Sequence, residues 1–111
     1  MSQRTEQLAS LIQHNLNEIL IRDIELPPNI FVTITRTDVT PDLSWAFIYI
    51  SVLPEGRQGT ALTALQKQAR AMQTKLNRTL HLAKFPRLRF KIDEVELKAR
   101  EIDDAINKLH Q

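Results

Sequence analysis

Apolar residues recur along the chain with two different periods, which separate helices from strands. Apolar positions three or four residues apart, from Leu8 to Leu20, predict an amphipathic helix over residues 3–22. Pro27 and Pro28 prevent its continuation, because proline lacks a backbone N–H and restricts the residue before it. The same spacing predicts a long helix over residues 60–83, stopped by Pro86, and a terminal helix over residues 97–111.

Three other segments are rich in β-branched and aromatic residues and predict strands. The first covers residues 30–40, where a change of apolar phase predicts a bulge near Thr35 or Arg36. Thr40-Pro41-Asp42 has turn chemistry, so residues 43–53 return as the second strand of a hairpin. Residues 87–92 alternate between polar and apolar types and predict the third strand. The order α-β-β-α-β-α predicts an α+β fold, with helices on one face of a three-stranded sheet.

The length and the composition suit one ordinary soluble domain, residues 1–111. The chain has no cysteine, so a disulfide framework, a thiol nucleophile and a thiolate metal site are excluded. No apolar run approaches the roughly 20 residues that span a bilayer, and the first ten residues lack the apolar core of a signal peptide. We therefore expect a cytoplasmic protein.

Charge changes this ordinary picture, because residues 56–92 carry nine cations and no acid. Solvated helix faces usually mix signs, since Glu and Lys three or four residues apart support each other. A single-sign face therefore favours polyanion binding over a merely solvated surface. The apolar side of this helix is Leu, Ala and Met, which favours nucleic acid over a membrane. We predict one continuous phosphate-binding surface formed by Lys67, Arg70, Lys75, Arg78, His81, Lys84, Arg87, Arg89 and Lys91.

Three aromatic residues, Trp45, Phe47 and Tyr49, alternate with aliphatic residues on the second strand. The aliphatic set is expected to face the core, which leaves the aromatic set on the other face of the sheet. Packing of the terminal helix over the aromatic side chains is the favoured interpretation. The alternatives are base stacking and a protein contact. A protein contact through these aromatic residues would make the chain a small protein-interaction or dimerisation module.

Other polar residues give no sign of a catalytic or metal site. His14, His81 and His110 are far apart and lack nearby carboxylates at metal-ligand spacing. No activating partner accompanies the serines of the second strand, and no Walker-type loop is present. The acids at 93–96 and 103–104 are expected to be solvated, or to repel RNA from the wrong face. We expect no enzyme activity, no metal and no cofactor.

Three segments carry a resemblance to a known family. They are TDVTPDLSWAFIYISVL at residues 37–53, FPRLRFKID at 85–93 and REIDDAINKLHQ at 100–111. In order and spacing they resemble the ribosome-binding factor A family, maturation factors of the bacterial small ribosomal subunit. The resemblance covers essentially the whole chain.

This resemblance implies a KH-like type II fold, α-β-β-α-β with an added C-terminal helix. It also implies binding to the free small ribosomal subunit and its 16S rRNA, in late maturation and rRNA processing, with importance in the cold. It implies no catalysis, no membrane and no small-molecule substrate, and we expect a monomer off the ribosome.

Two features of the long helix and its start depart from this pattern. The family's Ala-x-Gly kink falls at residues 68–71, where this chain has no glycine. The helix therefore either kinks without glycine or runs straighter than usual. Gly56-Arg57-Gln58-Gly59 matches the GxxG clamp of KH domains, but it follows a strand and is expected to be a strand-to-helix turn.

Overall fold

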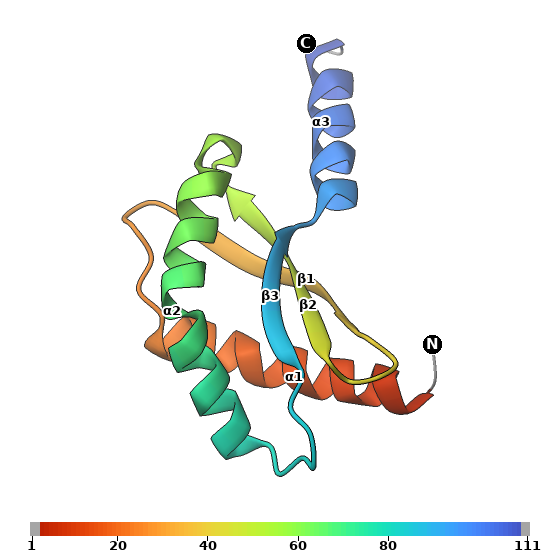
Figure 1. Ribbon diagram of the computed structural model, residues 1–111. Helices are drawn as coiled ribbons and strands as arrows, with labels where there is room; N and C mark the ends of the chain where they lie inside the picture. The colour runs from red at the N-terminus through yellow and green to blue at the C-terminus, as the bar shows by residue number, and fades with distance from the viewer. Residues whose placement is uncertain (1–2, 110–111) are drawn as a thin grey trace.

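The computed structural model describes residues 3–109, whose elements follow the predicted order (Figure 1). The helices are α1 (Gln3–Asp23), α2 (Gln58–Thr79) and α3 (Glu94–Leu109), with a short 3₁₀ turn, η1 (Glu55–Arg57), before α2. The strands are β1 (Phe31–Val39), β2 (Trp45–Leu53) and β3 (Arg87–Ile92).

The sheet has the order β1-β2-β3, with β1 antiparallel and β3 parallel to β2. The β1–β2 register shifts between Ile34 and Arg36, so the predicted bulge is confirmed at Thr35. The predicted turn is also confirmed. Its Thr40 hydroxyl donates to Asp42 Oδ1 (2.8 Å) and accepts from the Trp45 N–H (3.1 Å).

The core lies between one face of the sheet and the helices α1 and α2. Every second residue of β2 is fully buried, and these are the predicted aliphatic residues Ala46, Ile48, Ile50 and Val52. They share a buried cluster with Ile12 and Leu16 of α1 and with Leu65, Met72 and Leu76 of α2. The alternation along β2 therefore decides which face the two helices cover.

Two glutamine side chains attach α2 to the chain around it. Gln68 accepts a hydrogen bond from the Glu25 N–H (3.0 Å) and donates to the Glu25 carbonyl (2.7 Å). Gln73 accepts from the Leu88 N–H (3.0 Å) and donates to the Pro86 carbonyl (3.2 Å). Each carboxamide thus satisfies backbone groups of a neighbouring segment. The helix remains continuous through residues 68–71.

The end of α2 differs from the prediction of a helix to residue 83. The helix ends at Thr79, and Leu80 has an extended backbone (φ −100°, ψ 125°). Leu80 and Pro86 are buried, and Leu82 and Phe85 pack against the core. This burial in an irregular segment outweighs the continuing helical period. At the other end, Gly56 lies in η1 and Gly59 in the first turn of α2, which confirms a strand-to-helix connection.

The last helix, α3, projects away from the sheet (Figure 1) and has no buried residue. The prediction that it covers the aromatic side chains is therefore wrong. It begins at Glu94, because the preceding Asp93 accepts the Glu96 N–H at Oδ1 (3.0 Å) and caps the helix. Arg100 then donates to the Val52 carbonyl (3.4 Å), which holds the helix beside the end of β2. His110 and the last residue lie outside the described residues.

Candidate nucleic-acid interface

Four of the predicted phosphate-binding cations lie on α2, whose opposite side is in the core. Lys67, Arg70 and Arg78 are exposed, and within residues 3–109 none of them forms an ion pair. Lys75 differs, because it is partly buried and its Nζ lies 3.4 Å from Asp23 Oδ2 of α1. Three of the four helix cations are therefore available to a ligand.

The sequence pattern placed His81 and Lys84 on this helix. That placement is wrong, because α2 ends at Thr79, before both residues. Both are exposed in the segment that joins α2 to β3. The Nζ of Lys84 donates to the Asp42 carbonyl (3.0 Å) in the β1–β2 turn. Lys84 therefore has a structural contact of its own, which a charge reversal would disturb.

The cations of β3 lie on a different face from those of α2. Arg87, Arg89 and Lys91 are exposed and alternate with Leu88, Phe90 and Ile92, which pack against the core. We call the α2 cations the helix set and the β3 cations the strand set, and their joining into one continuous surface stays a prediction. The sets approach each other at a groove of about 470 Å³, whose lining includes Arg70, Trp45 and Arg87.

The strand set shares its face with the three aromatic residues of β2. In the parallel register Trp45, Phe47 and Tyr49 are opposite Arg87, Arg89 and Lys91, respectively. The Arg87 guanidinium carbon lies 5.6 Å from the Trp45 ring centroid, and Lys91 Nζ lies 4.4 Å from that of Phe47. These distances are in the range of cation–π contacts.

A further cation on this face, Arg36 of β1, was not among the predicted site residues. Its guanidinium carbon lies 4.0 Å above the Tyr49 ring centroid. The bulge at Thr35 sets the face on which Arg36 lies, since an extra residue reverses the alternation of a strand. The predicted bulge was therefore the signal that could have found it.

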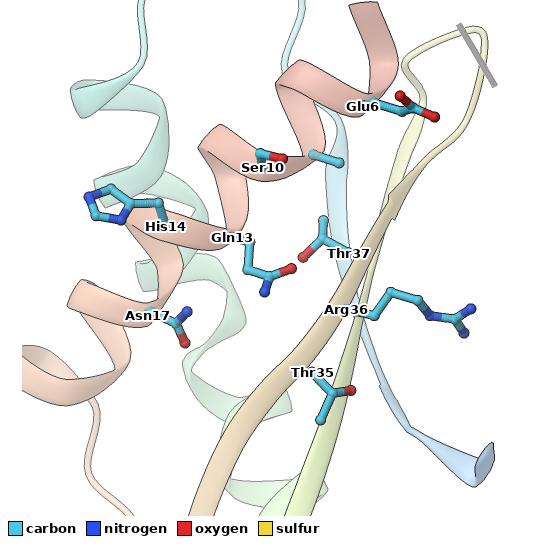
Figure 2. Close-up of a pocket in the computed structure, with 9 residues that line it drawn as sticks. Glu6, Ser10, Gln13, His14, Asn17, Thr35, Arg36 and Thr37 are labelled. Carbon is cyan, nitrogen blue, oxygen red and sulfur yellow. The ribbon is translucent and has the colours of Figure 1, made fainter. Parts of the chain in front are cut away.

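A second cleft, of about 500 Å³, lies between α1 and β1 (Figure 2). Figure 2 shows Gln13 of α1 and Thr37 of β1 pointing toward each other, whereas Arg36 points away from α1. The Thr37 hydroxyl is buried and has no hydrogen-bond partner within the described residues. This cleft holds none of the predicted site residues, and the sequence pattern did not indicate it.

The acids were expected to be solvated, and this is wrong for Asp93. It is only 9% exposed, and its Oδ2 accepts the Thr35 hydroxyl (2.5 Å). That hydrogen bond, followed by the one from the Glu96 N–H, holds the pKa of Asp93 below its usual value. The acids at 103–104 are exposed, as predicted.

Metal binding and membrane insertion receive no support from the described part of the chain. Within residues 3–109, no group of three or more His, Cys, Asp or Glu side chains is placed to hold a metal ion. No helix there is both long and apolar enough to cross a bilayer. His14 and His81 are exposed, and His14 Nε2 lies 3.4 Å from Glu18 Oε1.

The fold and these surfaces define a small α+β protein with cations on both sides of a three-stranded sheet. The sequence model of the ribosome-binding factor A family matches residues 4–106, and the chain belongs to this family. It is 36% identical to ribosome-binding factor A of Psychrobacter arcticus, over 97% of this chain and 87% of that protein. The predicted family and KH-like fold class are confirmed.

Solved structures agree with this assignment. The NMR structure of a Thermotoga maritima protein assigned to ribosome binding factor A is 33% identical, with a TM-score of 0.67 over 82% of this chain and 88% of that chain. A model of the Thermus thermophilus factor, fitted into a cryo-EM map of its 30S complex, has a TM-score of 0.60. That likeness covers 83% of this chain and 93% of that chain at 22% identity, so it shows the fold alone.

Proposed function

We propose that this protein is a non-enzymatic assembly factor that binds the free small ribosomal subunit and its 16S rRNA. Its role is in late maturation and rRNA processing, with importance in the cold. Family membership supports the ribosome as target, and the Thermus relative was fitted into a 30S complex. The observation that carries the RNA contact is the set Lys67, Arg70 and Arg78 on α2, which are exposed and form no ion pair with any other described residue.

Phosphate contacts dominate this binding, because the α2 cations offer charge and hydrogen-bond donors with little base-reading chemistry. Each phosphate neutralised by Lys or Arg releases counterions, so affinity falls steeply with salt. His81, Lys84 and the β3 cations belong to the proposed interface as well. Lys75 supports it indirectly, through its ion pair with α1.

Such a factor acts only through differential affinity. Its binding favours one rRNA conformation by as much as its affinities for the alternative conformations differ. It leaves when a contact of the mature subunit competes for the same phosphates. This mechanism needs no reaction centre in the protein, in agreement with the absence of any sequence motif for one.

The test is a double charge reversal, Arg70→Glu with Arg78→Glu, measured by co-sedimentation with small subunits. These two residues are preferable to Lys84, whose Nζ contacts the β1–β2 turn. We expect binding to fall sharply, and the slope of log K against log salt to shrink by about 2, at 0.9 per lost phosphate contact. Thermal stability should change little, because both side chains are exposed.

A matched control reverses the exposed Arg4 of α1 and Lys98 of α3, which changes the net charge by the same amount. We expect this control to co-sediment almost as the parent does. Unaltered co-sedimentation of the Arg70/Arg78 variant would overturn the assignment of α2. An equal loss in the control would show that net charge alone governs binding.

A further inference from the structure

Within the part of the chain that the structure describes, no helix covers one face of the sheet, since α1 and α2 occupy the other face and α3 projects away. We call it the open sheet face. Its aromatic residues lie on the central strand, and its cations lie on the two outer strands. Its charged residues and the aromatic residues of β2 are Arg36, Asp38, Trp45, Phe47, Tyr49, Arg87, Arg89 and Lys91, and Arg36 Nη1 lies 3.9 Å from Asp38 Oδ2.

The aromatic side chains of this face hold the cations in place. Trp45, Phe47 and Tyr49 are half-buried, and each has a cation over its ring at 4.0 to 5.6 Å. The Trp45 and Phe47 rings are nearly parallel, with an interplanar angle of 13° and centroids 6.3 Å apart. A guanidinium has five N–H groups, so Arg87 over Trp45, and Arg36 beside its ion pair with Asp38, retain donors for an anion. Less side-chain entropy is then lost when a ligand binds.

The charge of this face selects its ligand. Asp38 is the only acid in the three strands, so cations dominate the surface. A second copy of the chain would place these cations against an identical set, and like charges across an interface are costly. The dimerisation alternative is therefore disfavoured. The ligand must be anionic, and it must also make use of flat rings.

We propose that the open sheet face binds a short single-stranded RNA segment, separately from the α2 cations. Unpaired bases stack on aromatic rings or on Arg guanidinium planes, while the cations of the outer strands contact the phosphates. In a duplex the bases stack on each other and offer no free ring face. An acidic peptide would match the charge, but would leave the rings without flat partners.

This inference rests on the proposed function and extends it, because the protein would then contact two RNA segments at once. One is held by Lys67, Arg70 and Arg78 on α2, and the other by the open sheet face. The groove lined by Arg70 and Arg87 lies where the two surfaces meet. A factor with this geometry fixes a single-stranded segment relative to a neighbouring rRNA helix.

Trp45 supplies the direct readout, because it is the only tryptophan in the chain and lies on this face. Titration with a ten-nucleotide oligouridylate should quench its fluorescence, whereas a blunt RNA hairpin should bind with little quenching. Fluorescence anisotropy of the labelled RNAs gives both affinities. The leucine double variant Phe47→Leu with Tyr49→Leu should bind the oligouridylate at least tenfold more weakly, since stacking contributes about 5- to 150-fold per base.

Two further variants keep the result interpretable. Arg89→Gln changes an exposed side chain outside the ring contacts, so it tests the face even if the leucine variant fails to fold. We expect it to weaken oligouridylate binding about threefold or more. Lys67→Gln with Arg78→Gln is the reciprocal control, because neither residue lines the groove with Trp45; it should weaken hairpin binding and preserve the Trp45 quenching.

Three results would overturn the proposal. The first is oligouridylate binding without a change in Trp45 fluorescence, and the second is equal binding by the parent and both open-face variants. The third is equal quenching by a poly-glutamate peptide, which would assign the face to an acidic protein. Co-sedimentation of the parent with small subunits is measured alongside. If that persists while the oligouridylate fails, the proposed function stands and only this inference falls.

Discussion

Replacing Asp93 with alanine should release two parts of the molecule at once. The side chain follows β3 directly, and its Oδ2 accepts the hydroxyl of Thr35 at the bulge of β1 (2.5 Å). Its Oδ1 accepts the Glu96 N–H (3.0 Å) in the first turn of α3. One carboxylate therefore joins the two outer strands of the sheet and caps the last helix.

The hydrogen bond from Thr35 should affect the global free energy of unfolding, whereas the cap on the Glu96 N–H should affect the helicity of α3. Losing a hydrogen bond to a charged group costs about 1.5–3 kcal/mol, and losing an N-cap costs about 1 kcal/mol. Because α3 buries no residue, the cap should affect the helicity of α3 and not the unfolding of the core. The free energy of unfolding should therefore fall by about 1.5–3 kcal/mol. The low end is favoured, since Thr35 keeps the Tyr49 carbonyl as an acceptor (3.3 Å).

Denaturant unfolding and amide hydrogen exchange measure these two effects. With an unfolding entropy of about 2.1 cal/mol/K per residue, each kcal/mol lowers the Tm of 111 residues by about 4 °C. Asp93→Asn is the matched control, because asparagine caps helices as well as aspartate does. It should keep the exchange protection of α3 and lose about half as much global stability as Asp93→Ala loses. Thr35→Val should lower global stability and leave α3 protected.

The pH dependence follows from the direction of the pKa shift. The pKa of Asp93 is lower in the folded protein than its ordinary value of 3.8. The stabilisation is therefore present above that value and is lost as the pH falls through the folded pKa. Asp93→Asn should lack this acid-dependent loss. A free energy of unfolding for Asp93→Ala within about 0.5 kcal/mol of the parent's would refute this role of Asp93, and so would an equal loss of α3 exchange protection in Thr35→Val.

Three further predictions concern other parts of the fold. Thr40→Ala should raise the pKa of Asp42 from about 2, because the Thr40 hydroxyl is the main cause of its lowering; NMR titration of the carboxyl measures this. Ile48→Ala should cost about 2–5 kcal/mol in denaturant unfolding, because Ile48 is fully buried on β2, whereas a cost under 1 kcal/mol would contradict the assigned core. Arg100→Ala should reduce the exchange protection of the first turns of α3 without changing core stability, since it removes the contact with the Val52 carbonyl.

Local patterns along the chain predict most of this fold. The alternation in β2 and β3 gives the core face of each strand, and the phase change in β1 gives the bulge at Thr35. The turn after β1 follows from its residue types. These features depend on residues close together in the sequence, so the sequence alone is enough to predict them.

The errors arise where distant residues decide the outcome. The helical period continues to residue 83, but burial of Leu80 against the core ends α2 at Thr79. The amphipathic pattern of α3 predicts a covered face, but the cap at Asp93 and the Arg100 contact direct the helix away from the sheet. The arrangement of the candidate site also depends on distant residues. Adjacent cations in the sequence lie on opposite sides of the sheet once α2 packs on one face.

The Gln73 carboxamide has a consequence for how this protein behaves among other chains. β3 is an outer strand, and the backbone groups of such a strand are a template for pairing with another chain. Gln73 hydrogen-bonds the Pro86 carbonyl and the Leu88 N–H, as a neighbouring strand would. One side chain thereby occupies the start of this edge, so another chain cannot pair with β3 at Pro86 and Leu88 unless it displaces Gln73.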